Sequence, residues 1–261
     1  IFFPLGAPII SAALARTQEP EMALAAYSVA FSVAALISSP MWGIRQLSNT
    51  FGGDRQMLHL VGRLALVLSS IAVGIILLIC LAPISRFVLD RLMGIPPAIG
   101  RLVPPALVVM ALNPYLSVGR GFYQGILVHY GKPGPIGVGA VGYLLSVAAA
   151  MVWGMFWSDL PGALLAALAM MAGQLVYFLV CWWPCRDIMQ TRIPTADPGI
   201  TAQQRSGNYL LFFYMPLALS IVFTTVTEPI LQSGMARAPI SAASLAAYPV
   251  CVAIMWLGVT P

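Results

Sequence analysis

The sequence alternates long apolar runs with short polar segments. A helix that crosses a lipid bilayer needs about 20 consecutive apolar residues, and most of these runs reach that length almost without charge. The pattern therefore predicts eight membrane-spanning helices. We expect them at residues 1–15, 24–44, 64–84, 102–127, 136–157, 160–183, 209–231 and from 244 onward. The first and last runs meet the ends of the sequence, so we expect both spans to be truncated.

Composition supports the same fold class. Hydrophobic residues make up 60% of the 261 residues and charged residues only 8%, whereas a soluble domain carries about 25% charged residues. A chain with this few charged residues cannot form a surface that faces water. Lipid must therefore surround it. We expect an all-α integral membrane protein with the lipid bilayer as its first partner.

The basic residues predict the orientation. They stand singly between the apolar runs, which is typical of membrane loops and argues against nucleic-acid binding. Eight fall on one side of the predicted spans and five on the other. The larger group is Arg45, Arg55, Arg63, Arg120, Lys132, Arg186, Arg192 and Arg205; the smaller is Arg16, Arg86, Arg91, Arg101 and Arg237. The positive-inside rule then predicts a cytoplasmic N-terminus, and we expect the bacterial cytoplasmic membrane.

An internal repeat suggests the domain organisation. Residues 24–29 (LAAYSV) match residues 245–250 (LAAYPV) at five of six positions, and a Pro-Leu pair precedes each copy. Six predicted spans separate the two copies, so both point the same way through the membrane, as in many secondary transporters. We expect a six-helix lobe at 1–185, a cytoplasmic linker at 186–208, and the first two helices of a second lobe at 209–261. A complete protein would have about twelve helices.

Local motifs add a family resemblance. The segment Ser39-Pro40-Met41-Trp42-Gly43 is followed by Gly52-Gly53-Asp54-Arg55, the fourth span ends in Arg120-Gly121-Phe122-Tyr123-Gln124-Gly125-Ile126, and the seventh contains Pro216-Leu217-Ala218-Leu219. The sequence resembles the superfamily of multidrug, oligosaccharidyl-lipid and polysaccharide exporters that includes the MATE transporters. Within it, the sequence is most similar to the progressive ankylosis protein branch.

The resemblance implies a MATE-like bundle of two six-helix lobes that rock between inward and outward openings. It implies a secondary transporter that exports or flips a small or amphipathic solute, coupled to a proton or a sodium ion, without any other cofactor. A flippase of lipid-linked saccharides is the alternative within the superfamily, and an arginine-lined cavity would favour it. A membrane-embedded enzyme is a third reading, but such enzymes need clustered His, Asp or Glu, and the eight acids and two histidines are scattered.

Glu228 is the most informative candidate residue. It lies in the apolar seventh span before Pro229, and a carboxylate there is costly unless it has a function. It can serve as a cation or proton site, as a gate contact, or as an interfacial acid. Glu228 follows Pro216 by twelve residues, as Arg16 follows Pro4. We therefore predict that Arg16 and Glu228 approach each other when the outer side is closed; the alternative is that Arg16 snorkels to the interface.

Six more polar residues are candidates for substrate contact or gating. Each also has a structural alternative. Asn113 precedes Pro114 and a predicted kink; Tyr27 and Tyr248 occupy equivalent repeat positions and can pack between helices; Gln174 can bond across helices; Arg120 and Gln124, one turn apart near the cytoplasmic end, can contact an anionic solute or a headgroup. We expect no catalytic residue. We also expect no metal site: Cys181 and Cys185 are one turn apart but lack further ligands, and His59 and His129 fall in predicted loops.

Overall fold

The computed structural model describes residues 6–17, 19–157, 160–195, 205–238 and 241–259, and every regular element in these ranges is helical. The chain begins with α1 (Gly6–Leu14), α2 (Pro20–Ser38), the 3-10 turn η2 (Ser39–Gly43), α3 (Ile44–Thr50) and α4 (Arg55–Ile79). It continues with α5 (Ala82–Ser85), the π-helical η3 (Arg86–Leu92), α6 (Pro97–Gly100), α7 (Val103–Met110) and α8 (Asn113–His129). It ends with α9 (Gly134–Trp157), α10 (Gly162–Thr191), α11 (Gly207–Thr225), α12 (Thr227–Ala236) and α13 (Ser241–Val259).

The helices match the apolar runs of the sequence. Within the described residues, five continuous helical stretches are long and apolar enough to cross a membrane, and a sixth span results if the bent pair of α6–α7 and α8 is counted as one. Each of the eight expected runs corresponds to one helix or to consecutive helices. Within the described residues, α1 has nine residues and α13 has 19. The protein is therefore an all-α integral membrane protein.

Two spans depart from a regular α-helix near prolines, and one of them is broken. The axes on either side of the α7–α8 junction differ by 42°, and Pro114 occupies the second position of α8, so the kink expected at Pro114 is confirmed. The second expected span is a single stretch from Pro20 to Thr50 that passes through the η2 turn at Pro40. Because proline lacks an amide hydrogen, it leaves carbonyls of the preceding turn without an intrahelical partner.

The helix α10 extends beyond the end of its apolar run. The sequence suggested a linker from Arg186 onward, but α10 continues to Thr191. Pro184 lies inside the helix without ending it. Arg186 and Asp187 are exposed on this last part, where a helix that leaves the hydrocarbon gains from charged side chains at headgroup level. The end of a hydrophobic run therefore does not mark the end of the helix.

Large apolar side chains lie on the outside of the bundle. Phe212 is 81% exposed, Phe156 76% and Phe223 70%. Exposed aromatic side chains at this density would cost free energy in water, but they are favourable against lipid. Inside the bundle, glycine allows close approach: a Cβ at Gly173 of α10 would come within 2.7 Å of Tyr143 and Val147 of α9.

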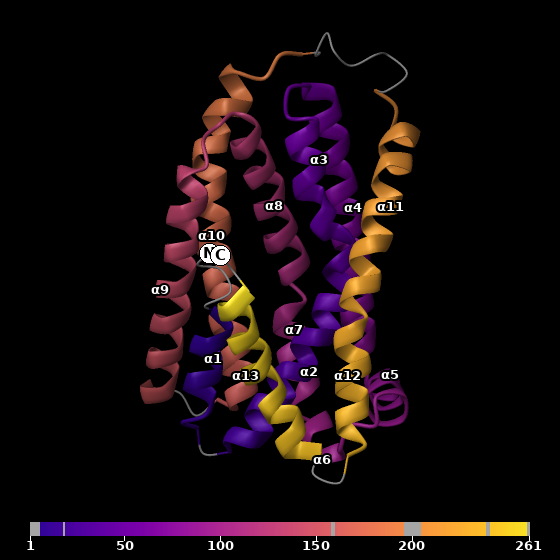
Figure 1. Ribbon diagram of the computed structural model, residues 1–261, viewed down its shortest axis with the longest axis vertical. Helices are drawn as coiled ribbons and strands as arrows, with labels where there is room; N and C mark the ends of the chain where they lie inside the picture. The colour runs from indigo at the N-terminus through magenta and orange to yellow at the C-terminus, as the bar shows by residue number, and fades with distance from the viewer. Residues whose placement is uncertain (1–5, 18, 158–159, 196–204, 239–240, 260–261) are drawn as a thin grey trace.

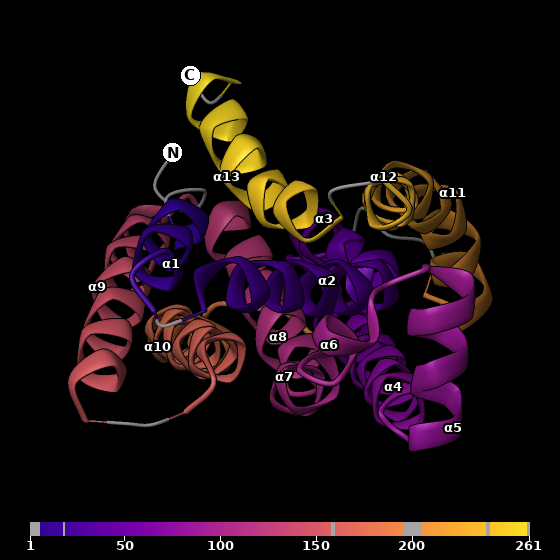
Figure 2. The same ribbon diagram turned by 90° about the horizontal axis from the view of Figure 1, so that it is seen from below.

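The bundle has two distinct ends, which we call the linker end and the hairpin end (Figure 1). At the linker end α4 begins, α8 and α10 end, and α11 begins; at the hairpin end α1 is joined to α2 and α12 to α13. Seen from the hairpin end, α13 lies on one side of α2, and α4, α7 and α8 lie on the other (Figure 2). We call α1–α10 the six-helix unit.

The repeated segments occupy the same register in their helices. Leu24 is the fifth residue of α2, and Leu245 is the fifth residue of α13. Both leucines are buried, at 7% and 0% exposure. Both helices start at the hairpin end, so the match in sequence corresponds to equal depth in the bundle.

Candidate functional site

A cavity lies where the six-helix unit meets α12 and α13. It has a volume of about 320 Å³, and its walls come from α1, α2, α9 and α10 on one side and from α12 and α13 on the other. Most of the surface area that lines it comes from apolar atoms. The polar side chains among its lining residues are Ser11, Tyr27, Ser28, Tyr143, Gln174, Glu228, Gln232 and Tyr248. We call it the central cavity.

Glu228 supplies the charge of the central cavity. Among the described residues that line it, Glu228 is the one carboxylate, and none is Lys, Arg or His. It lies in the first turn of α12, which continues the span of α11 after Val226. Holding a carboxylate within a span costs free energy, which makes Glu228 the leading functional candidate of the cavity.

Gln232 joins α12 to α2 beside Glu228. Its side chain is 1% exposed. Its Nε2 donates to Ser28 Oγ at 3.0 Å and to the Ser28 carbonyl at 3.3 Å, and Ser32 Oγ donates to Gln232 Oε1. The amide is thus held on both its donor and its acceptor side. This cluster fixes the face of α12 that presents Glu228 to the cavity, since Glu228 and Gln232 are one turn apart.

The repeat tyrosines lie on opposite walls of the central cavity. Tyr27 comes from α2, and Tyr248 comes from α13. Tyr27 is buried, and its hydroxyl contacts Met170 Sδ at 3.5 Å. The sequence left cavity lining and helix packing open for this pair, and the structure places both residues on the cavity.

Arg120 lies directly behind the wall formed by Gln174. Its Nη1 donates to Gln174 Oε1 at 2.8 Å, and its guanidinium carbon is 4.8 Å from the centre of the Tyr177 ring. Gln174 is 4% exposed and also lines the cavity. The expectation that Arg120 lies near the cytoplasmic end is therefore wrong, because Gln174 is close to the middle of α10. Gln124, one turn further along α8, is buried against Tyr177 and Cys181.

Two candidates lie away from the central cavity. Arg16 is exposed and lines a separate hollow at the hairpin end with Glu19 and Gly162, so this conformation does not bring it to Glu228. Their pairing stays a prediction for another conformation. Asn113 is 7% exposed at the α7–α8 break, and its Oδ1 has no hydrogen-bond partner among the described residues.

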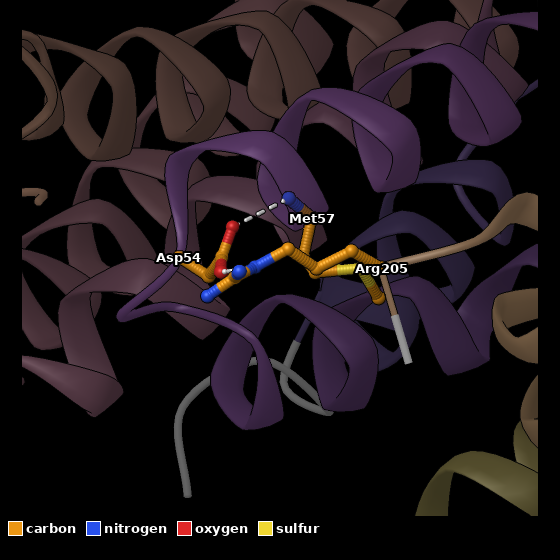
Figure 3. A network of polar contacts seen from close by, with 3 residues as sticks. All are labelled: Asp54, Met57 and Arg205. Carbon is orange, nitrogen blue, oxygen red and sulfur yellow. Dashed lines mark hydrogen bonds and ion pairs between the residues drawn. The ribbon is translucent and has the colours of Figure 1, made fainter. Parts of the chain in front are cut away.

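A second polar cluster stands at the linker end (Figure 3). Asp54 caps α4, because one carboxylate oxygen accepts a hydrogen bond from the Met57 amide at 3.0 Å. The other oxygen pairs with Arg205 Nε at 2.8 Å. Asp54 is fully buried, and the Arg205 side chain is 21% exposed. Because Arg205 lies next to Ser206, the N-cap of α11, this pair ties the start of α11 to the start of α4.

Further contacts hold α11 against the second span beyond this ion pair. Phe51, directly after α3, meets Phe213 of α11 edge to face at 5.8 Å between ring centres, and the Tyr214 hydroxyl donates to the Pro40 carbonyl in η2. A Cβ at Gly43 would lie 2.8 Å from Leu217. The helix α11 therefore packs against the η2–α3 half of the second span.

No group of three or more His, Cys, Asp or Glu side chains within the described ranges is arranged to hold a metal ion. Cys181 and Cys185 are both fully buried. Cys185 Sγ donates to the Tyr123 carbonyl at 3.3 Å, which is the contact of a packed thiol.

Sequence reasoning missed Gln232 and the serines that hold it. A signal was present: Gln232 follows Glu228 by one helical turn within an apolar segment, and Ser28 and Ser32 are also one turn apart on α2. Polar residues that recur every four positions in a span predict a polar stripe facing another helix.

The comparisons with known proteins agree with this fold. Residues 4–261 match the family described as progressive ankylosis protein (ANKH). The chain belongs to this family. No curated protein matches the chain.

A solved structure extends the comparison. The protein is similar, with a TM-score of 0.72 at 20% sequence identity, to a multidrug resistance MATE family transporter of the MOP superfamily in an inward-facing conformation. The match covers 98% of this chain and 58% of that one. The family member described here thus has a MATE-like fold and spans a little over half the length of the solved transporter.

Proposed function

We propose that this protein is part of a secondary transporter that exports or flips a small or amphipathic solute by rocking alternating access. The observation that carries the proposal is the central cavity, whose walls come from both copies of the repeat. A cavity between two repeats is where secondary transporters hold their solute, and relative motion of the repeats then exposes it to either side. We assign the linker end to the cytoplasm. With Arg120 in the interior, seven basic residues remain there against five at the hairpin end, so the bias keeps its direction.

The lining of the cavity suits an amphipathic solute. Apolar side chains such as Ile10 and Phe31 alternate with tyrosine hydroxyls and amides. Apolar walls supply burial, while a few placed polar groups orient the solute. A reaction would need an activated nucleophile or a general base beside a second reactive group. Glu228 is the one such candidate among the described lining residues, so a transport role fits better than an enzymatic one.

Glu228 is our candidate for the residue that binds the coupling ion, which would be a proton or a sodium ion. A carboxylate within a span favours a cation or a proton over remaining charged and unpaired. The neighbouring oxygens of Gln232 and Tyr248 line the same cavity. We propose that ion binding at Glu228 neutralises the cavity and thereby changes the relative stability of its open states.

Arg120 offers a site for a negatively charged group on the solute. Its partner Gln174 Oε1 lies on the cavity wall, so an anionic group that displaced this oxygen would gain a charge-assisted hydrogen bond. A flippase of lipid-linked saccharides would be favoured by several arginines in the cavity. The described lining residues include none, and we retain that function as the second candidate.

Flux into proteoliposomes tests the coupling role. A panel of labelled small organic anions and cations is offered under an imposed sodium or pH gradient. We expect Glu228→Gln to abolish gradient-dependent flux and Glu21→Gln, an exposed acid at the hairpin end, to leave it unchanged. Gradient-dependent flux that is equal in both variants would refute the role of Glu228.

The same assay tests Arg120. We expect Arg120→Gln to reduce the flux of anionic members of the panel by about tenfold, as the loss of a charge-assisted hydrogen bond predicts. Neutral and cationic members should be affected much less. An equal loss for all members would show that Arg120 only supports the packing of α8 against α10.

A further inference from the structure

A larger groove lies on the side of the six-helix unit that faces away from α13. It is bounded by α4, α8 and α10 and has a volume of about 680 Å³. These helices lie across α2 from α13 (Figure 2), so the groove is separate from the central cavity. None of its lining residues belongs to α11, α12 or α13.

The groove follows one face of α4 from the linker end toward the middle of the bundle. Arg55, His59, Arg63, Leu66 and Ser69 line it, and their spacing of three and four residues places them on one face. Fourteen residues separate Arg55 from Ser69, which corresponds to about 20 Å along the helix. This length matches one leaflet of a bilayer, whose hydrocarbon is about 15 Å deep, together with its headgroups.

Positive charge lines the groove from the linker end to about its middle. Arg55 and Arg63 of α4 face Arg186 of α10 across it, and all three are exposed. No Asp or Glu is among the described lining residues. Of the acids nearest in sequence, Asp54 is paired with Arg205, and Asp187 does not line the groove. His59, which the sequence assigned to a loop, lies within α4 and also lines the groove.

The inner part of the groove is aromatic and apolar. Its walls include Phe122 and Tyr123 of α8 and Phe178 and Trp182 of α10. Tyr123 meets Phe178 edge to face at 5.6 Å and Phe122 at 5.4 Å, which fixes these rings in place. The groove thus has a cationic mouth at headgroup level and an apolar floor at acyl-chain level.

We propose that the α4–α8–α10 groove binds one anionic phospholipid. Its phosphate lies among Arg55, Arg63 and Arg186, and an acyl chain runs along Leu66 and Phe122 toward Ser69. Basic pockets between membrane helices on the cytoplasmic side bind anionic headgroups in this way. The site does not depend on the transported solute. A free phosphate would use only the cationic mouth, whereas the exposed apolar floor requires a chain to cover it.

Quenching of Trp182 tests the proposal, because this residue lines the groove. The protein is reconstituted in phosphatidylcholine vesicles that contain either brominated phosphatidylglycerol or brominated phosphatidylcholine. The difference between wild type and Trp182→Phe isolates the Trp182 signal from the other tryptophans. We expect brominated phosphatidylglycerol to quench Trp182 at severalfold lower content than brominated phosphatidylcholine, and this preference to weaken as salt rises.

Three variants and one control separate the contribution of the arginines from that of the apolar floor. Arg63→Gln and Arg186→Gln should each reduce the preference for phosphatidylglycerol by about fivefold, whereas Arg192→Gln, an exposed arginine at the same end outside the groove, should leave it unchanged. Gly62→Leu should reduce quenching by both lipids. A Cβ at Gly62 comes no closer than 3.9 Å to Phe122, so the protein tolerates the side chain while the groove is filled.

Three results would overturn the proposal. Equal quenching by the two lipids would mean that the groove holds only unselected boundary lipid. A preference that Arg192→Gln reduces as much as Arg63→Gln would mean a diffuse surface charge effect. The third result is that excess inorganic phosphate abolishes the preference for phosphatidylglycerol while chloride at the same ionic strength does not. This result would mean that the groove is a site for a free anion.

Discussion

At the linker end an ion pair joins α11 to the six-helix unit, whereas on the wall of the central cavity an uncharged amide joins α12 to it. Asp54 and Arg205 form the first contact, and Gln232 forms the second with Ser28 and Ser32. Asp54 and Gln232 are both buried, and both clusters connect residues more than 150 positions apart in sequence. They differ in chemistry because they differ in depth.

The depth of each cluster explains its chemistry. Asp54 begins a helix, where headgroups and water are near and where the capping hydrogen bond repays part of the cost of burying the carboxylate. Gln232 lies within a span, where a charge costs more and an amide can still bond on both sides. The ion pair therefore suits a permanent contact between α11 and α4 beside the linker. The amide suits a contact on the wall of a cavity, where a solute can compete for its hydrogen bonds.

The largest effect is expected at Asp54. Asp54→Ala removes the cap of α4 and leaves Arg205 without its carboxylate, so we expect a loss of about 3 kcal/mol in the free energy of unfolding. Asp54→Asn keeps an acceptor for the Met57 amide and should lose about half as much. Thermal unfolding in a neutral detergent measures both. Equal midpoints of thermal unfolding for Asp54→Ala and wild type would show that Asp54 does not stabilise the contact between α11 and α4.

A smaller effect on stability is expected at Gln232. Gln232→Leu keeps the approximate shape but removes the hydrogen bonds to Ser28 and from Ser32, which costs about 1 to 2 kcal/mol. The matched control is Gln46→Leu, an exposed amide in α3. The same unfolding measurement applies. If Gln232→Leu destabilised the protein more than Asp54→Ala, the proposed difference between a fixed and an exchangeable contact would be reversed.

The smallest effect is expected at Arg237. Its Nη2 donates to the Leu92 carbonyl at 3.1 Å, and the side chain is exposed at the hairpin end. Solvent competes for such a contact, so we expect Arg237→Gln to change the free energy of unfolding by less than about 0.5 kcal/mol. A loss of unfolding free energy comparable to that of Gln232→Leu would identify a third stabilising contact between the two parts of the bundle. The comparison of two clusters would then be incomplete.

Hydrophobic patterning predicted most of the fold, with errors at the helix ends. The eight expected runs correspond to helices, and the kink near Pro114 lies where expected. The end of α10 was misplaced because hydrophobicity reports the thickness of the hydrocarbon, whereas the helix continues as long as its backbone hydrogen bonds are satisfied. The same reasoning placed His59 in a loop, although α4 begins at Arg55.

The candidate site was predicted in part. Glu228, Gln174, Tyr27 and Tyr248 were singled out from the sequence, and the structure brings all four to one cavity. The repeat was the useful signal for the tyrosines, since equal register in two parallel helices implies equal depth. The pairing of Arg16 with Glu228 stays a prediction for the state in which the outer side is closed, because residue spacing specifies depth but not the conformation in which two side chains meet.

By itself the sequence determined that this protein resides in a bilayer as a helical array with an internal repeat. Those properties depend on local hydrophobicity and on periodicity, which the chain carries at every position. The tertiary structure alone decided that Arg120 turns inward to Gln174, that Gln232 bridges to Ser28, and that three arginines face one lipid-side groove. Each of these depends on the rotation of one helix about its axis against another, which is set by packing over the whole bundle.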